Sequence, residues 1–142
     1  MVKIAIAADH GGVDVKSMLK VELEAAGYDI IDLGTNTKQS VDYPDYADKM
    51  AASIKNGTAD RGILICGTGI GISIAANRHK HLRAALCSSV TDARLAREHN
   101  DANVIALGAR TMGDILILDC VQTFLTTEFE GGRHAARVAK MS

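Results

Sequence analysis

The sequence of 142 residues contains no tryptophan and only one proline, two phenylalanines and three tyrosines. Its three cysteines, Cys66, Cys87 and Cys120, form neither an even disulfide set nor a C-x-x-C pair, and no second ligand cluster at zinc spacing accompanies them. A disulfide scaffold and a structural zinc site are therefore not expected. The pattern indicates a reducing compartment, and we expect a cytoplasmic protein.

The sequence also lacks an excess of charge of either sign. The chain carries 16 basic and 17 acidic residues, for a formal net charge of -1. This balance argues against nucleic acid or an acidic membrane as partner, so an anionic ligand must be bound locally. No apolar run reaches the length of a membrane span, and residues 1–12 are too short for a secretory signal, so we expect neither membrane association nor processing.

Short apolar runs alternate with amphipathic ones, and the length predicts one domain spanning residues 1–142. The predicted strands are 3–8, 29–33, 62–66, 83–87 and 104–107. The predicted helices are 13–26, 46–55, 70–78, 91–99 and 112–126, with Thr91 as an N-cap and Pro44 in the connection before the second helix. This alternation predicts an α/β, doubly wound, Rossmann-like domain: a five-stranded parallel sheet with helices on both faces.

The run GILICGTGIGISIAANR, residues 62–78, leads from a buried strand through Cys66 into a glycine-rich turn. It is not a dinucleotide fingerprint because Ile72 occupies the third glycine position, and it lacks the lysine of a phosphate loop. A turn that opens a helix favours negative charge on an oxyanion, a phosphate or a cysteine thiolate. The alternative interpretation is a tight turn beside an ordinary buried cysteine.

The segment Asp9-His10-Gly11-Gly12 follows the first predicted strand. A carboxylate beside an imidazole suits proton transfer and anion binding, although Asp9 would also serve simply as a helix cap. Because the carboxyl ends of adjacent parallel strands border one crevice, we expect Asp9 and Cys66 to be able to contact one small ligand.

Two later clusters supply further polar groups. His99 and Asn100 close the fourth predicted helix, where the helix dipole alone would favour a histidine. Arg133 and Arg137 lie four residues apart in GGRHAAR, so they share one face if this tail is helical, an arrangement that suits a phosphate. A solvated basic helix end is the alternative for this second cluster.

Together these segments resemble the ribose-5-phosphate isomerase B family of sugar-phosphate isomerases over essentially the whole chain. The resemblance is carried by AADHGG (7–12), VDYPDYA (41–47), the run at 62–78, EHNDANV (98–104), GAR (108–110) and EGGRHAARV (130–138). The related galactose-6-phosphate isomerase subunits match less well. One type lacks the cysteine motif, and the other lacks both the HND pattern and the GGRHxxR tail.

The resemblance implies that ribose 5-phosphate and ribulose 5-phosphate interconvert through an enediolate without a metal or organic cofactor. It assigns Cys66 as the base, His99 to opening of the sugar ring and Asp9 to shuttling hydroxyl protons. The backbone amides of the turn and the Thr68 hydroxyl would hold the enediolate oxygens. Some family members use a glutamate a few residues downstream, but residues 71–75 offer no carboxylate, which leaves Cys66 as the base on this turn.

The resemblance also implies a set of substrate-binding residues: His10, Tyr43, Gly67, Gly69, Ile70, Gly71, Asn100, Arg110, Arg133 and Arg137. Of these, Arg133, Arg137 and His10 would hold the phosphate. A homodimer, or a dimer of such dimers, is implied, with each site completed by both chains; which chain supplies His99 and the arginines stays open. Two alternatives remain, an isomerase mainly for a six-carbon sugar phosphate such as allose 6-phosphate, and a non-catalytic phosphate-ligand sensor.

Overall fold

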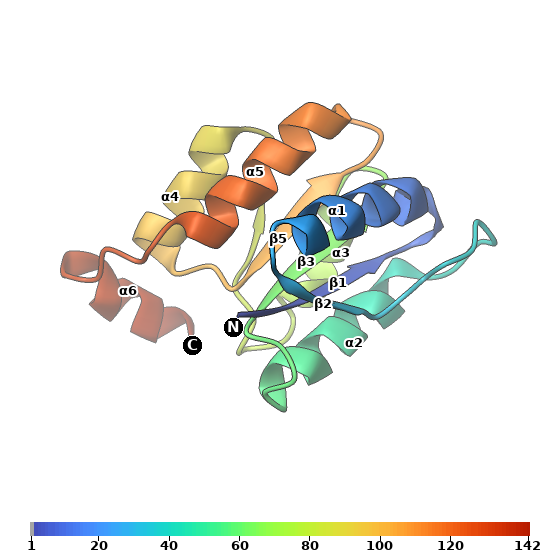
Figure 1. The fold of residues 1–142 in the computed structure, drawn as a ribbon. Coiled ribbons are helices and arrows are strands. Elements are labelled where there is room, and N and C mark those ends of the chain that lie inside the picture. The colour runs from blue at the N-terminus through green and yellow to red at the C-terminus, as the bar shows by residue number, and fades with distance from the viewer. Residues whose placement is uncertain (1) are drawn as a thin grey trace.

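The computed structural model describes residues 2–142, which form strands and helices in alternation (Figure 1). The strands are β1 (Lys3–Ala8), β2 (Asp29–Asp32), β3 (Arg61–Cys66), β4 (Ala84–Leu86) and β5 (Val104–Gly108). The helices are α1 (Val13–Ala25), α2 (Tyr43–Lys55), α3 (Ile70–Ala76), α4 (Val90–Asn100), α5 (Asp114–Thr126) and α6 (Arg133–Met141), with a short 3-10 turn, η1, at His10–Gly12.

The five strands make one sheet in the order β2-β1-β3-β5-β4, and every pairing is parallel. The predicted α/β doubly wound sheet is therefore confirmed. The chain passes from β1 outward to β2 and then returns past β1 to β3, so the direction of winding reverses between β1 and β3. In such folds this reversal opens a crevice at the carboxyl ends of the two strands.

Helices cover both faces of the sheet (Figure 1), so the central strands β1, β3 and β5 are almost wholly buried, whereas the edge strands β2 and β4 are partly exposed. Alternate residues such as Ile6, Ile63 and Ile105 pack in the same cluster as residues of α1, α4 and α5. Their neighbours, including Leu64 and Cys66, pack in a second cluster with residues of α2 and α3. Cys66 thus belongs to the α2/α3 face of the sheet.

Three predicted helix starts differ from the structure: α5 begins at Asp114 rather than 112, and the starts of α2 and α4 also differ. Helix α2 begins at Tyr43 rather than 46, and Pro44 lies within its first turn, where a missing N–H leaves no intrahelical hydrogen bond unmade. Helix α4 is capped by Ser89 rather than Thr91, because the extended backbone of Ser89 lets its hydroxyl accept a 3.0 Å bond from the amide of Asp92.

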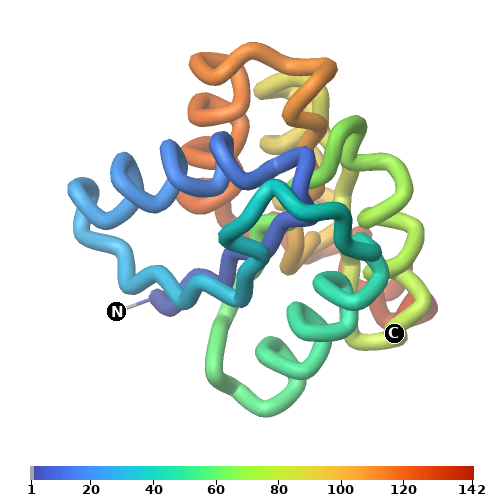
Figure 2. Tube along the Cα trace, turned by 90° about the vertical axis from the view of Figure 1, so that its right-hand side faces the viewer, coloured from blue at the N-terminus to red at the C-terminus, as the bar shows by residue number. Residues whose placement is uncertain are grey.

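Helix α6 stands apart from the two helical layers and packs on α4, beside the amino ends of the strands (Figure 1). Figure 2 looks along the sheet from its carboxyl edge, with the connection of residues 34–42 in front and α6 behind. Among residues 2–142, no helix has the length and apolar character needed to cross a membrane. Both termini of the described chain lie at the amino edge of the sheet, opposite the crevice at its carboxyl edge (Figure 1).

Candidate functional site

The carboxyl edge of the sheet gathers the ends of β1, β3 and β5. The amide of Asp9 donates to the carbonyl of Ile65 at 3.1 Å, and the amide of Ala109 donates to the carbonyl of Cys66 at 2.9 Å. One residue further, the amide of Arg110 donates to the carbonyl of Gly67 at 2.8 Å. These bonds hold the segments that follow β1, β3 and β5 next to one another, so that together they form one surface.

Cys66 is the last residue of β3 and is only 5% exposed. Its Sγ accepts a hydrogen bond from the amide of Gly69 at 3.1 Å. Gly69 has φ of +77°, and a Cβ there would lie 2.8 Å from the carbonyl carbon of Leu107, so the turn requires glycine. A backbone donor directed at the sulfur stabilises negative charge on it, which sets Cys66 apart from an ordinary core cysteine.

The other two cysteines, Cys87 and Cys120, are core residues. Cys87 is 1% exposed and Cys120 is fully buried, both in the cluster on the α1 face. Burial raises the pKa of the Cys87 thiol to about 12, and burial likewise raises the pKa of Cys120. Both thiols therefore stay protonated and unreactive at neutral pH.

Asp9 and His10 follow β1 and lie against this turn. Asp9 is buried, and its Oδ1 accepts a 2.9 Å bond from the amide of Gly11, so it does cap η1. A Cβ on Gly11 would lie 3.5 Å from the amide nitrogen of Gly67, which places the first and third connections in contact. The imidazole of His10 is partly buried, and its Nδ1 accepts a bond of 3.2 Å from the amide of Val41.

An open pocket of about 470 Å³, lined by Asp9, His10 and residues 41–45, lies at this edge. That volume suits a small metabolite. The ring of Tyr43 lies against the backbone of Gly71, since a Cβ on that glycine would come within 2.6 Å of the tyrosine Cζ. Thr68 and Ile70 are exposed in the turn.

The structure thus brings many of the predicted site residues to the carboxyl edge: Asp9, His10, Tyr43, Cys66, Gly67, Thr68, Gly69, Ile70, Gly71 and Arg110. The remaining four, His99, Asn100, Arg133 and Arg137, are not among them. They lie at the end of α4 and on α6, which are beside the amino ends of the strands (Figure 1).

The separation of the two groups follows from element lengths. The eleven residues of α4 carry the chain about 16 Å back from Ser89, just beyond the end of β4, to Asn100, just before the start of β5. Strand β3 spans roughly 17 Å between the two edges. The alternation of strands and helices in the sequence already indicates where His99 and Asn100 lie, because a helix that connects two parallel strands ends at the amino edge of the sheet.

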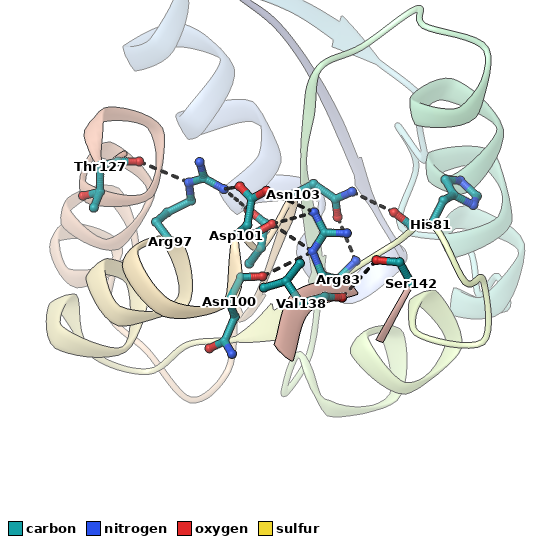
Figure 3. A network of polar contacts seen from close by, with 10 residues as sticks. His81, Arg83, Arg97, Asn100, Asp101, Asn103, Thr127, Val138 and Ser142 are labelled. Carbon is teal, nitrogen blue, oxygen red and sulfur yellow. Dashed lines mark hydrogen bonds and ion pairs between the residues drawn. The ribbon is translucent and has the colours of Figure 1, made fainter. Parts of the chain in front are cut away.

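A partly buried network of polar contacts fixes the turn that carries His99 and Asn100. Asp101 adopts a left-handed conformation with φ of +47°. Arg97, 4% exposed, donates a 2.8 Å bond to the carboxylate of Asp101. Arg83 donates to the backbone carbonyl of Asp101 at 2.9 and 3.0 Å (Figure 3). Arg97 also donates to the carbonyl of Ala102 at 2.7 Å, so the helix end is held from several sides.

Sequence reasoning missed the partners of His99. Its ring stacks on that of His134, with centroids 4.4 Å apart and planes 18° apart. Oε1 of Glu130 lies 3.9 Å from Nε2 of His99 and 3.5 Å from Nε2 of His134. The atoms of these three residues that could bind a metal ion lie within 4.8 Å of one another. The two imidazole rings are nearly parallel, however, so their lone pairs do not point at a common position for an ion. No signal in the sequence pairs these residues, because the stacking depends on how α6 packs against α4.

Comparisons with known proteins match nearly all of the chain. The family model described as Ribose/Galactose Isomerase matches residues 4–141. Ribose-5-phosphate isomerase B of Escherichia coli (strain K12) is 46% identical over 138 residues, covering 97% of this chain and 93% of that protein.

Solved structures are equally similar. Clostridium thermocellum ribose-5-phosphate isomerase B superposes with a TM-score of 0.97 at 54% identity, covering 99% of this chain and 95% of that one. The Mycoplasma genitalium ribose-5-phosphate isomerase B, solved with bound ribulose-5-phosphate, gives a TM-score of 0.93 at 42% identity, covering 99% and 93% of the two chains.

Proposed function

Because this chain belongs to the ribose/galactose isomerase family, we propose that it interconverts ribose 5-phosphate and ribulose 5-phosphate, with residues 1–142 acting as one isomerase domain. The observation that carries the proposal is the 3.1 Å bond from the Gly69 amide to the sulfur of Cys66. It directs a backbone donor at the sulfur at the end of a strand, beside a carboxylate and a pocket for a small molecule.

In the proposed reaction Cys66 is the base. Its thiolate removes the proton from C2 of the open-chain aldose, the C2–H electrons form the C1–C2 double bond, and the carbonyl electrons move to O1. The resulting enediolate is held by the amides of the turn at Gly67–Gly71 other than that of Gly69, which donates to Cys66, and by the hydroxyl of Thr68. The Cys66 thiol returns the proton to C1 while Asp9 moves the hydroxyl proton between the two oxygens, so no other reactant is consumed.

In this proposal, phosphate binding and ring opening use residues from both edges of the sheet. His10 holds the phosphate from the carboxyl edge, with Tyr43 and Arg110 lining the substrate. Arg133 and Arg137 add two guanidiniums, Asn100 a further contact, and His99 opens the furanose ring. These last four lie at the amino edge of their own chain, so the proposal requires them from a second copy.

This requirement supports a homodimer in which the amino edge of each chain completes the carboxyl edge of the other. A symmetric dimer satisfies both sites with one type of contact, and two such dimers can associate further. The three free, buried thiols are consistent with a reducing compartment, and we place the protein in the cytoplasm.

Direct turnover tests the proposal. The purified protein is incubated with ribose 5-phosphate and, separately, with allose 6-phosphate, and ketose formation gives kcat/KM for each. We expect turnover of ribose 5-phosphate with the higher kcat/KM. A higher value for allose 6-phosphate would assign the six-carbon substrate instead, and binding of both without turnover would make the protein a phosphate-ligand sensor.

A further inference from the structure

Lys16 is among the largest fully buried side chains in residues 2–142, with 1% of its surface exposed, and it carries a charge. It projects from α1, and its Nζ lies 2.7 Å from Oδ2 of Asp32 and 2.6 Å from Oδ1 of Asn36. A buried ammonium is costly unless it is paired and hydrogen-bonded. The catalytic proposal gives Lys16 no part, so its burial calls for a different role.

Both partners of Lys16 belong to the start of the connection between β2 and α2. Asp32 ends β2, and its Oδ1 accepts a 2.8 Å bond from the amide of Gly34. Burial raises the pKa of Asp32, but the bonds from Lys16, Gly34 and Lys20 outweigh it and hold that pKa below its ordinary value. The carboxylate therefore remains charged and anchors the connection to α1.

The same connection is tied to the end of β1, one residue before Asp9. The carbonyl of Gly34 accepts a 2.8 Å bond from the amide of Ala8, and the amide of Thr35 donates to the carbonyl of Ala8 at 2.8 Å. The bonds of Lys16 to Asp32 and Asn36, together with this pair of backbone bonds, fix the position of the chain at the start of residues 36–42.

Further along, the connection reaches His10. The amide of Val41 donates to Nδ1 of the imidazole at 3.2 Å. A ring nitrogen that accepts from an N–H carries a lone pair and no proton, so the neutral ring has its proton on Nε2. The backbone of the 34–42 connection thus selects one tautomer of His10, with Nε2–H as its donor.

We propose that Lys16 is a positioning residue for this site: by holding Asp32 and Asn36 it fixes the 34–42 connection, whose Val41 amide keeps His10 in the Nε2–H tautomer. The part of this inference that concerns phosphate binding rests on the proposed function. The tautomer itself does not, because it follows from the contacts of the free protein.

Four variants separate this role from simple stability. Asn36→Ala removes the link between Lys16 and the connection but leaves the buried pair with Asp32, and it is the main test should Lys16→Met not fold. Asn36→Asp keeps an acceptor for Lys16. Lys20→Met is the matched control, because Lys20 also bonds Asp32, at 3.0 Å, but from a side chain that is 33% exposed.

The direct readout is the tautomer of His10, from 15N–1H correlation spectra of the imidazole rings, with the His10 signal identified by its loss in His10→Gln. We expect the Nε2–H form in the wild type, Lys20→Met and Asn36→Asp, and a mixture of tautomers in Asn36→Ala and Lys16→Met. An unchanged Nε2–H signal in folded Asn36→Ala and Lys16→Met would overturn the inference.

Kinetics give the second readout. For Asn36→Ala we expect KM for ribose 5-phosphate to rise about tenfold, as for loss of one oriented hydrogen bond, with kcat within about twofold. If the wild type turns over ribose 5-phosphate normally but the His10 tautomer is unchanged in Asn36→Ala and Lys16→Met, this inference alone fails. A responsive tautomer in a protein that turns over neither sugar phosphate would defeat the proposed function alone.

Discussion

The amide of Gly69 points at the sulfur of Cys66, with 3.1 Å between the nitrogen and Sγ. The donor reaches the sulfur because Gly69 adopts φ of +77° and carries no Cβ, which would otherwise press on the backbone of Leu107. The glycine-rich turn therefore does more than reverse the chain. It builds a fixed positive partner for a thiolate beside the proposed substrate pocket.

Substitution of Gly69 by alanine tests this geometry. We expect Gly69→Ala to destabilise the protein by about 1–3 kcal/mol and to lower kcat/KM at least tenfold, because the residue is strained and the amide turns away from Cys66. Denaturant unfolding and the isomerase assay measure the two effects. Gly113→Ala is the control, since Gly113 has nothing within 4 Å of an added Cβ; equal effects of the two substitutions would contradict the account.

Mixing two inactive variants tests whether each site spans two chains. Cys66→Ala and Arg137→Ala are each expected to be nearly inactive. After joint refolding, the mixed dimer has one site with both residues intact, so a random mixture should recover about a quarter of wild-type activity. Recovery is measured against each variant refolded alone. No recovery, with mixed dimers present by native mass spectrometry, would place both residues in one chain's site.

Thiol reagents should distinguish the three cysteines. In the folded protein at neutral pH, we expect iodoacetamide to modify Cys66 and inactivate the enzyme, while Cys87, with its pKa raised to about 12, and Cys120 stay unmodified. Peptide mass spectrometry identifies the labelled residue. Saturating ribose 5-phosphate should slow the labelling, and loss of wild-type activity while Cys66 stays unlabelled would count against the assignment.

The Asp32 carboxyl gives a prediction for stability against pH. Its pKa is lowered in the folded state, so its contribution is present above its unfolded value, near 3.8, and is lost as pH falls through the folded value. The difference in unfolding free energy between wild type and Asp32→Asn should be constant above about pH 5 and shrink below about pH 4. Urea titrations across this range measure it, and a difference that grows on acidification would reverse the assigned sign.

The sequence predicted the sheet well because its three central strands, β1, β3 and β5, are buried on both faces and therefore appear as continuous apolar runs. Local chemistry was less reliable: Pro44 was placed in a connection although the first turn of a helix tolerates it, and Ser89 caps α4 in place of Thr91. The motif residues at the carboxyl edge were also foreseeable, since they follow strand ends directly.

Contacts between distant segments could not be predicted in this way. Lys16 looks like one more polar residue of an amphipathic helix, and only the fold buries it against Asp32 and Asn36. The stacking of His99 on His134 likewise depends on how α6 packs against α4, which neither motif encodes.

The rate at which the Cys66→Ala variant converts ribose 5-phosphate to ribulose 5-phosphate decides whether Cys66 is the base. Loss of a base in contact with the reacting carbon should lower kcat/KM by about 10³-fold or more, with circular dichroism and the unfolding midpoint close to wild type. A folded Cys66→Ala protein that retains kcat/KM within tenfold of wild type would contradict the assignment of Cys66 as the base.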